Sequence, residues 1–299
     1  MKKYPSKYIH TDLAAEGNPL PDTSSEGIDY SEYDHGFFTV QRLHIQTTEG
    51  AEKIGKPIGH YVTVGFPQCS SLGDDESEKL TLAVSNEIKR LAESMCPDGI
   101  ETVLIAGLGN RNITSDSLGP LCVGNINVTR HLNENGDKKY IPEVAAIAPG
   151  VLAQTGIETV ELIRGAAENC HPSLVIAIDA LAARSVERLA RTVQLSDVGI
   201  SPGSGIGNHR KKINAETVGY PVMAIGVPTV VDTATLVIDA LERAGIEEYP
   251  QSLIPILDEG SDFFVTLKDG DVAVAELSSI LFDALNLFFF EAGNNTEKS

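Results

Sequence analysis

The chain has 299 residues, 42% hydrophobic and 22% charged, which is enough apolar material for one large α/β domain or two smaller ones. Its 23 basic and 42 acidic residues give a formal net charge of −19, which disfavours direct binding to DNA or RNA phosphates. The N-terminus has basic residues but no apolar segment of a signal peptide. We expect no membrane-spanning helix, because the longest apolar run, 278–293, is short and contains Asp283. Burial or a subunit contact would explain this run.

The cysteines and histidines show no metal-binding pattern. Cys69, Cys96, Cys122 and Cys170 lack CxxC spacing, which indicates reduced thiols in a cytosolic protein. The 7 histidines form neither HxH nor HExxH, so each is predicted to be structural or solvated. We therefore expect neither a cofactor nor a bound metal.

The N-terminal quarter changes from an irregular segment to regular structure. Residues 1–36 are rich in Gly, Pro, Ser, Asp and Glu without periodicity, which predicts an extended or mobile leader. Alternating apolar and polar residues predict strands over 37–47 and 60–67, joined by a polar bridge. Acidic residues followed by apolar residues at helical spacing predict a helix over 74–95.

Strands and helices alternate from residue 101 onward. The predicted strands are 101–109, 143–149, 174–179, 192–200 and 221–228, the predicted helices are about 118–132, 155–169 and 230–243, and a long loop is predicted over 201–214. This alternation indicates βαβ units. We predict a three-layer α/β/α fold with a mainly parallel twisted sheet and a smaller N-terminal subregion that contains β-structure.

Two aspartates follow strands of the buried type. Asp116 lies in GLGNRNITSDSLGP (107–120), and Asp179 closes LVIAID (174–179). Open α/β sheets bind ligands at the carboxyl ends of strands next to a switch in strand order, and two carboxylates there can share a proton. No nucleophilic Ser or Cys motif competes, so an aspartate-based hydrolase is the leading chemistry. A helix-capping role for Asp116 is the alternative.

Other polar motifs fit a ligand site less well. GLGNRN has Asn112 at the third glycine position of a dinucleotide fingerprint, and Asp116 would place negative charge against the pyrophosphate. GSGIGN (203–208) follows no first strand and is predicted to be a loop. Asp232 is predicted to cap a helix, and Asp197 either caps a helix or lines the cleft.

Eight segments resemble the germination protease (spore protease) family of spore-forming bacteria, from about residue 8 to about residue 240. They are TDLAAEG, GKPIGHYVTV, GLGNRNITSDSLGP, NVTRHL, AIAPGVLAQTGIETVELIRG, LVIAIDALAARSVERL, TVQLSDVGISPGSGIGNHRKKI and AIGVPTVVD. The resemblance implies an endopeptidase that degrades small acid-soluble spore proteins during germination. It also implies a self-processing zymogen and a homotetramer in the cytoplasm of the developing forespore and the spore core. The family is an atypical aspartic peptidase whose two essential aspartates correspond to Asp116 and Asp179.

The resemblance also predicts where the leader is cut. Spore protease substrates, and the family's own N-terminal segment, are cut within an acidic–apolar–small–small–acidic stretch, which HTDLAAEG (10–17) matches. The scissile bond would be Leu13–Ala14, and we expect this stretch to be extended and accessible. Alternatively, Thr11 caps a short helix. The predicted organisation is a propeptide (1–13) and a single α/β peptidase domain (14–299), composed of an N-terminal extension with a β hairpin (14–73), a catalytic core (74–245) and a C-terminal region (246–299).

Several alternatives remain open. A more distant similarity to hydrogenase maturation proteases keeps a metal-dependent peptidase in view, although their additional metal-binding His has no convincing counterpart here. A non-enzymatic spore protein and a nucleotide-binding protein are further alternatives. Either aspartate could be the base. Asn110, Arg111 and Asn112 either donate hydrogen bonds to an oxyanion or cap the turn.

Overall fold

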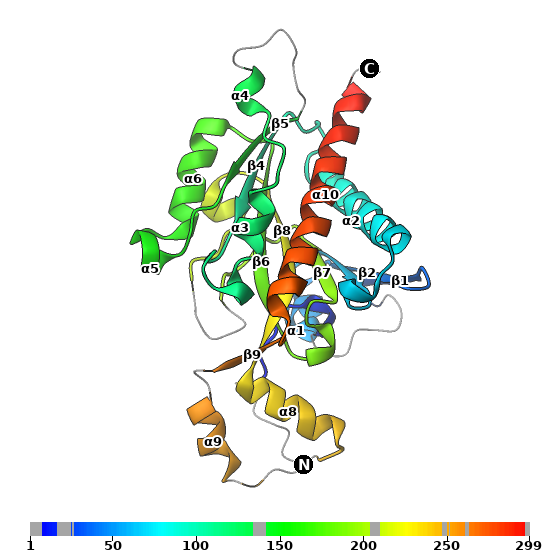
Figure 1. Cartoon of the computed structure of the whole chain (residues 1–299), viewed down its shortest axis with the longest axis vertical. Coiled ribbons are helices and arrows are strands. Elements are labelled where there is room, and N and C mark those ends of the chain that lie inside the picture. The colour runs from blue at the N-terminus through cyan, green and yellow to red at the C-terminus, as the bar shows by residue number, and fades with distance from the viewer. Residues whose placement is uncertain are drawn as a thin grey trace.

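The computed structural model describes residues 8–16, 25, 27–133, 142–203, 210–246, 250, 252–260 and 263–296. Its centre is a nine-stranded sheet of order β1-β2-β3-β7-β8-β6-β4-β5, with β9 paired to β8 (Figure 1). The strands are β1 (Ile28–Asp34), β2 (Thr39–Ile45), β3 (Gly59–Gly65), β4 (Thr102–Gly107), β5 (Glu143–Ile147), β6 (Leu174–Ala183), β7 (Thr192–Ser196), β8 (Val222–Asp232) and β9 (Phe264–Thr266).

Helices lie on both faces of this sheet. They are α1 (Thr48–Ile54), α2 (Asp74–Met95), α3 (Leu118–Val123), α4 (Arg130–Asn133), α5 (Leu152–Thr155), α6 (Thr159–Cys170), α7 (Ala215–Val218), α8 (Thr233–Arg243), α9 (Leu253–Gly260) and α10 (Gly270–Thr296). The larger core joins α2, α3 and α10 to one face, and a second core joins α6 and α7 to the other. The predicted α/β fold with three layers is therefore confirmed.

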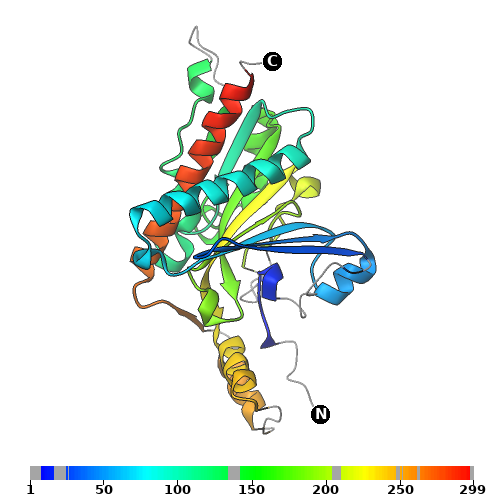
Figure 2. The same ribbon diagram turned by 90° about the vertical axis from the view of Figure 1, so that its right-hand side faces the viewer.

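The sheet has a parallel half and an antiparallel half. Strands β5, β4, β6 and β8 run parallel to one another, as the alternation of strands and helices predicts. Strands β1, β2, β3 and β7 continue the same sheet through antiparallel pairings. Figure 2 shows the resulting twist, with the blue N-terminal strands running across the green and yellow ones. The N-terminal β-structure is thus part of the main sheet.

The N-terminal region is more ordered than its composition suggests. Residues 28–34, predicted to belong to a mobile leader, form edge strand β1. Ile28 is fully buried against Leu43 and Ile45, while most of the strand's other residues are polar and at least partly exposed. An edge strand with one deeply buried residue gives no alternating pattern, which explains why the prediction failed.

Two strands and one helix also differ from their predicted lengths. Strand β6 continues to Ala183, so Asp179 lies inside the strand and not at its end, because the small residues after it still pair with β8. Strand β8 likewise continues to Asp232. The predicted helix over 118–132 is two short helices, α3 and α4, separated by a non-helical segment that begins at Gly124.

Helix α10 corrects the expectation that no apolar run is long enough to span a membrane. By length and composition Gly270–Phe290 qualifies, with a mean hydropathy of 1.7. In this structure, however, 56% of its most apolar window is buried inside the molecule, and Leu277, Leu281 and Phe288 belong to the larger core. Helix α10 therefore packs as a core helix, which agrees with the predicted burial of 278–293.

Candidate functional site

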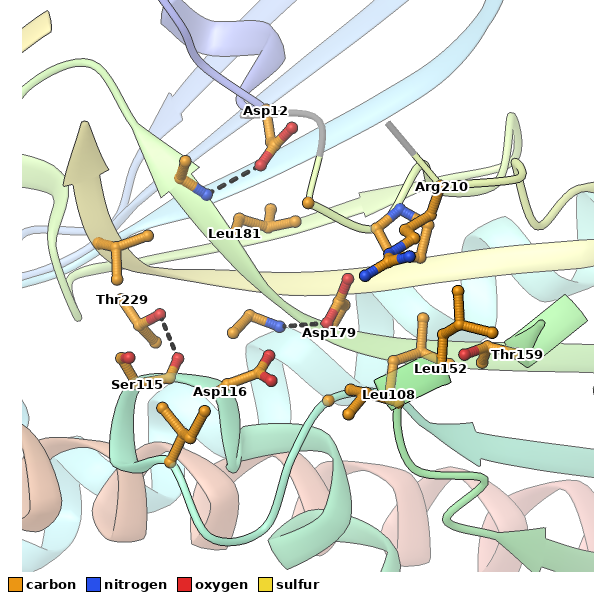
Figure 3. Close-up of a pocket in the computed structure, with 18 of the residues that line it drawn as sticks. Asp12, Leu108, Ser115, Asp116, Leu152, Thr159, Asp179, Leu181, Arg210 and Thr229 are labelled. Atoms are coloured by element: carbon orange, nitrogen blue, oxygen red, sulfur yellow. Dashed lines mark hydrogen bonds between the residues drawn. The ribbon is translucent and has the colours of Figure 1, made fainter. Parts of the chain in front are cut away.

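The two predicted aspartates line one cavity of about 230 Å³ (Figure 3). The cavity opens where strand order switches, because β5 lies on one side of β4 while β6 and β8 lie on the other. Such a switch point is the usual ligand site of an open α/β sheet. Strand β4 ends at Gly107, opposite Ile178, so Asp179 is the first residue of β6 beyond this pairing. The loop after β4 then brings Asp116 to the same place.

Tight backbone packing positions Asp116. It ends the 3-10 helix η4 (Thr114–Asp116), and its Oδ2 accepts the Asn110 N–H at 2.8 Å. Gly109 has φ +106°, and a Cβ there would lie 2.1 Å from the Asp116 carbonyl oxygen, so no other residue fits this turn. The Thr229 hydroxyl of β8 donates to the Ser115 carbonyl oxygen at 2.6 Å, which ties η4 to the sheet. Asp116 is thus held by both loop and sheet.

Asp179 is held by the sheet and is 4% exposed. It pairs with Gly226 of β8, and its Oδ1 accepts the Ala180 N–H at 2.9 Å. Burial raises the pKa of Asp179 well above its ordinary value, and the charges of Asp116 and Asp12 raise it further. Asp116 is half-buried, and burial also raises its pKa, while the Asn110 N–H opposes the rise.

The two carboxyl groups are therefore unequal. Asp179 is the more deeply buried, and two neighbouring carboxylates disfavour its ionised form. When the pair holds one proton, that proton belongs on Asp179. A protonated carboxylic acid beside an ionised carboxylate can supply a general acid and a general base in one cavity.

Comparison with known proteins identifies the family. The family model described as "Germination protease" matches residues 10–244. The chain belongs to the germination protease family. It is therefore a protease, and the resemblance seen in the sequence is confirmed.

Curated relatives carry the same name. The "Germination protease" of Clostridium perfringens (strain ATCC 13124) is 41% identical over 279 residues, which is 88% of this chain and 81% of the relative. That of Clostridium acetobutylicum is 37% identical, with 93% and 85% covered. That of Bacillus subtilis is 43% identical, with 78% and 66% covered.

Among solved structures, a [NiFe] hydrogenase maturation protease, HycI from Thermococcus kodakarensis, is 17% identical. It aligns with a TM-score of 0.33 over 58% of this chain and 99% of that protein. This structural similarity is too low to support a conclusion about mechanism. In the described part of the chain, no group of three or more His, Cys, Asp or Glu side chains could hold a metal ion.

Beside the cavity that holds Asp116 and Asp179, the polar residues after β4 cap the turn. Asn110 Oδ1 accepts the Asn112 N–H at 3.0 Å and a Gln154 amide N–H at 2.8 Å. Arg111 donates to the Pro120 carbonyl oxygen at 3.3 Å. Of the two roles predicted for this trio, the structure favours capping. Arg210, which sequence reasoning did not select, lines the dyad cavity and extends from its wall in Figure 3.

The other predicted acids do not join the dyad. Asp232 caps α8, with its Oδ1 accepting the Thr235 N–H at 2.8 Å, as predicted. Asp197 is not among the residues lining the dyad cavity; its carboxylate accepts the His60 N–H and bonds to His60 Nδ1, both at 2.7 Å. GSGIGN (203–208) lies almost entirely outside the described residues.

The leader adds a third carboxylate that sequence reasoning missed. Asp12 lines the dyad cavity, and its Oδ2 accepts the Ala182 N–H at 2.9 Å. Its own N–H donates to the Ala182 carbonyl oxygen at 2.9 Å. Figure 3 shows Asp12 on the same side of β6 as Asp179. The acidic residue of the HTDLAAEG stretch was a signal for this contact, but only the fold shows its partner.

The predicted cleavage site is neither extended nor accessible. Leu13 is 0% exposed and Ala14 1% exposed, and Ala14–Glu16 form a 3-10 helix, η2. The Ala14 N–H donates to Gln194 Oε1 at 2.5 Å, and the Leu13 carbonyl oxygen accepts the Glu16 N–H at 3.4 Å. The Thr11 hydroxyl accepts the Leu13 N–H at 3.1 Å, close to the alternative of a short helix capped by Thr11. The expected exposure is therefore wrong, because the apolar Leu13 side chain is buried in a cluster with Leu181, Ala183, Leu189 and Val231.

Proposed function

We propose that this protein is an aspartic endopeptidase that starts the degradation of small acid-soluble spore proteins during germination, through the pair Asp116 and Asp179. The observation that carries the proposal is the unequal pair itself. Two carboxyl groups from different elements line one cavity, and burial and neighbouring charge raise the pKa of Asp179 most. Structural acids that serve only as helix caps, such as Asp232, have their carboxylate on a backbone N–H of the following helix.

In the proposed mechanism, ionised Asp116 removes a proton from a water molecule as its oxygen attacks the scissile carbonyl carbon. Protonated Asp179 donates a hydrogen bond to the carbonyl oxygen, which polarises the bond and stabilises the charge that develops there. When the tetrahedral intermediate collapses, Asp179 gives its proton to the leaving nitrogen, which departs as an amine, and the proton that Asp116 took from water passes to Asp179. The other product is a carboxylic acid.

We further propose that the chain is a zymogen that cuts itself between Leu13 and Ala14. The Leu13 carbonyl oxygen and the Ala14 N–H, which belong to this peptide bond, both form hydrogen bonds within the folded chain, and both residues are buried. A peptidase needs its substrate extended across the catalytic groups, so the leader must leave this position before it is cut. The folded turn restrains processing in the intact chain.

The proposed setting is the cytoplasm of the developing forespore and the spore core, with the chain acting as a homotetramer. Exposed apolar residues just before β9 and on α9 would suit a subunit contact: Phe263 is 66% exposed and Ile256 62% exposed. Sedimentation of the full chain at several concentrations tests the assembly, and Phe263→Asp should weaken it if this surface is the contact.

The decisive experiment follows hydrolysis of a peptide that contains Asp-Leu-Ala-Ala-Glu by the wild type, Asp116→Asn and Asp179→Asn. Each substitution should lower kcat by at least about 100-fold, since a positioned acid or base contributes roughly 10²–10⁴ in rate. Asp232→Asn is the matched control, because it changes a buried acid of the same type outside the cavity. Near-normal turnover by either dyad variant would remove that residue from the mechanism.

N-terminal sequencing tests self-processing separately. Wild-type chain incubated at mildly acidic pH should yield a protein that starts at Ala14, whereas Asp179→Asn should keep residues 1–13. Maturation of the Asp179→Asn chain on its own, or cleavage far from Leu13, would contradict the proposal.

A further inference from the structure

The edge of β6 beyond β4 presents backbone N–H groups to carboxylates. Strand β4 stops opposite Ile178, while β6 continues to Ala183. Past that point the N–H of Ala180 is capped by Asp179, that of Ala182 by Asp12, and that of Arg184 by Glu16. Alternate residues of a strand point their N–H groups to the same edge, so one edge of β6 meets three acids in succession.

The leader supplies two of these acids. Asp12 forms two hydrogen bonds with Ala182: its N–H donates to the Ala182 carbonyl oxygen, as in an added strand, and its side-chain carboxylate accepts the Ala182 N–H. Glu16, four residues later, accepts the N–H of Arg184 at 2.6 Å and that of Ser185 at 2.9 Å. Asp12 and Glu16, four residues apart, thus meet N–H groups only two residues apart, at Ala182 and Arg184, because Ala14–Glu16 form the turn η2 between them. Backbone N–H groups of residues 182, 184 and 185 therefore bind the two acidic side chains.

Between the two acids, the Leu13 side chain fills an apolar pocket. It is buried in a cluster with Leu181, Ala183, Leu189 and Val231. Leu181 also lines the cavity of the catalytic pair, so the pocket and the dyad share a wall. A large apolar residue and the acid before it are therefore held beside Asp179.

The leader also lies between two cavities. Asp12 and Leu181 line both the dyad cavity and a second cavity of about 120 Å³, which reaches Lys56 and Gln194. Lys56 Nζ donates to the Thr11 carbonyl oxygen at 3.0 Å, and Gln194 donates to the Asp12 carbonyl oxygen at 3.2 Å. Asp12 is therefore part of the wall between the two cavities.

We propose that the surface of β6 and its neighbours that holds Asp12 and Leu13 in this chain is the part of the substrate groove that binds the residues before the scissile bond. An acidic residue of the substrate binds the Ala182 backbone as Asp12 does, through its own N–H and its side-chain carboxylate. The apolar residue after it enters the pocket of Leu181, Ala183, Leu189 and Val231. The inference rests on the proposed peptidase function. It is limited to the positions of Asp12 and Leu13, because cleavage at Leu13–Ala14 releases these residues while Glu16 stays with the mature chain.

Leader and substrate then exclude one another, which the uncut chain can test. Leu13→Asp places a charge in the apolar pocket and should free the groove without cutting the leader. The uncut variant, verified by mass spectrometry, should hydrolyse the Asp-Leu-Ala-Ala-Glu peptide at least about 10-fold faster than uncut wild type. Leu82→Asp, the same change at an exposed position of α2, is the matched control and should not activate the chain. An uncut Leu13→Asp chain as inactive as uncut wild type, beside an active mature enzyme, would overturn the inference.

The pocket itself is tested by its size. Leu189→Ala in the full chain, matured as the wild type is, enlarges the pocket and should favour a peptide with Phe over one with Leu before the scissile bond. The ratio of kcat/KM for the Phe and Leu peptides should rise about 10-fold, the scale of apolar pocket discrimination. Val186→Ala, in η5 (Val186–Arg188) but 38% exposed, is the control. An unchanged ratio in a folded Leu189→Ala enzyme would overturn the assignment.

Including Asp179→Asn in each assay distinguishes a failure of the proposed peptidase function from a failure of the groove assignment alone. Hydrolysis that persists without Asp179 would contradict the proposed function. Hydrolysis that needs Asp179, but ignores both Leu13→Asp and Leu189→Ala, would contradict only the groove assignment.

Discussion

The two aspartates that we propose as catalytic come from unlike regions. Asp116 sits on a turn held by glycines and by one hydrogen bond from β8 to the neighbouring Ser115, and it is half-buried. Asp179 sits inside a central strand, almost fully buried, with carboxylates of the loop and of the leader nearby. The same side chain therefore has two different proton affinities in one cavity. The difference indicates that a dyad can assign acid and base through where each residue lies in the sheet.

The strongest way to break this comparison is to remove both carboxyl groups together. If Asp116 and Asp179 act as one unit, the double Asn variant should be scarcely slower than either single variant, although each single change costs at least about 100-fold in kcat. Steady-state hydrolysis of one peptide by the four proteins measures this. Multiplicative losses would mean that the two residues act independently.

Removal of the leader's charge should alter the dyad's pH range. Asp12 raises the pKa of Asp179, so Asp12→Asn should lower that pKa. Asp179 must be protonated to act as the acid, so the highest pH at which the full chain still matures should fall. The upper pH limit of maturation is compared between wild type and Asp12→Asn. An unchanged limit would show that the leader's carboxylate does not act on the dyad.

The two Asn variants should lose activity but gain stability, and Asp179→Asn should gain more stability than Asp116→Asn. The folded-state pKa of Asp179 lies above its unfolded value, so the folded chain binds the proton more tightly, and the stability this provides is lost as pH rises through the folded pKa. Asp179→Asn removes that loss, so its Tm should exceed the wild-type Tm at neutral pH. Asp116→Asn should gain less, since a backbone N–H stabilises the ionised form.

Thermal unfolding of the three proteins at about pH 3.5 and at pH 7 measures this contrast. At the lower pH, near the unfolded pKa of about 3.9, the advantage of Asp179→Asn should shrink. A neutral-pH Tm of Asp179→Asn below that of wild type would contradict the assignment of the buried proton.

Removal of metal ions should have no effect on the rate of peptide hydrolysis. Two carboxylates without His or Cys ligands form a weak site for a transition metal. Peptide hydrolysis in excess chelator should therefore match the untreated rate. Loss of activity that zinc, manganese or nickel restores would favour the metal-dependent alternative.

Sequence patterns predicted most elements because the α/β core follows local periodicity. The strong apolar face of 74–95 became α2, and the strand before Asp116 became β4. The prediction failed where a residue's position depends on distant partners. Strand β6 continues beyond the acidic residue Asp179 because β8 pairs with it there, and β1 forms because β2 pairs with it.

The site was predictable in part for the same reason. Both aspartates were visible as polar residues after apolar strands, but their unequal burial depends on where β4 ends. The contacts of Asp12 and Leu13 could not be predicted from the sequence, since they join residues about 170 positions apart in the chain, as in the hydrogen bond from Ala182 to Asp12. The leader's acidic and small residues suggested a cleavage site, but not that the same residues are buried.

The most direct test of the central claim is a carboxyl ¹³C NMR titration of the full chain, with Asp116→Asn and Asp179→Asn used to assign the two signals. The account predicts that Asp179 keeps its proton to a distinctly higher pH than Asp116, and that its titration moves to lower pH in Asp116→Asn because one neighbouring charge is gone. Ionisation of Asp179 at or below the pH at which Asp116 ionises would contradict the assignment of acid and base.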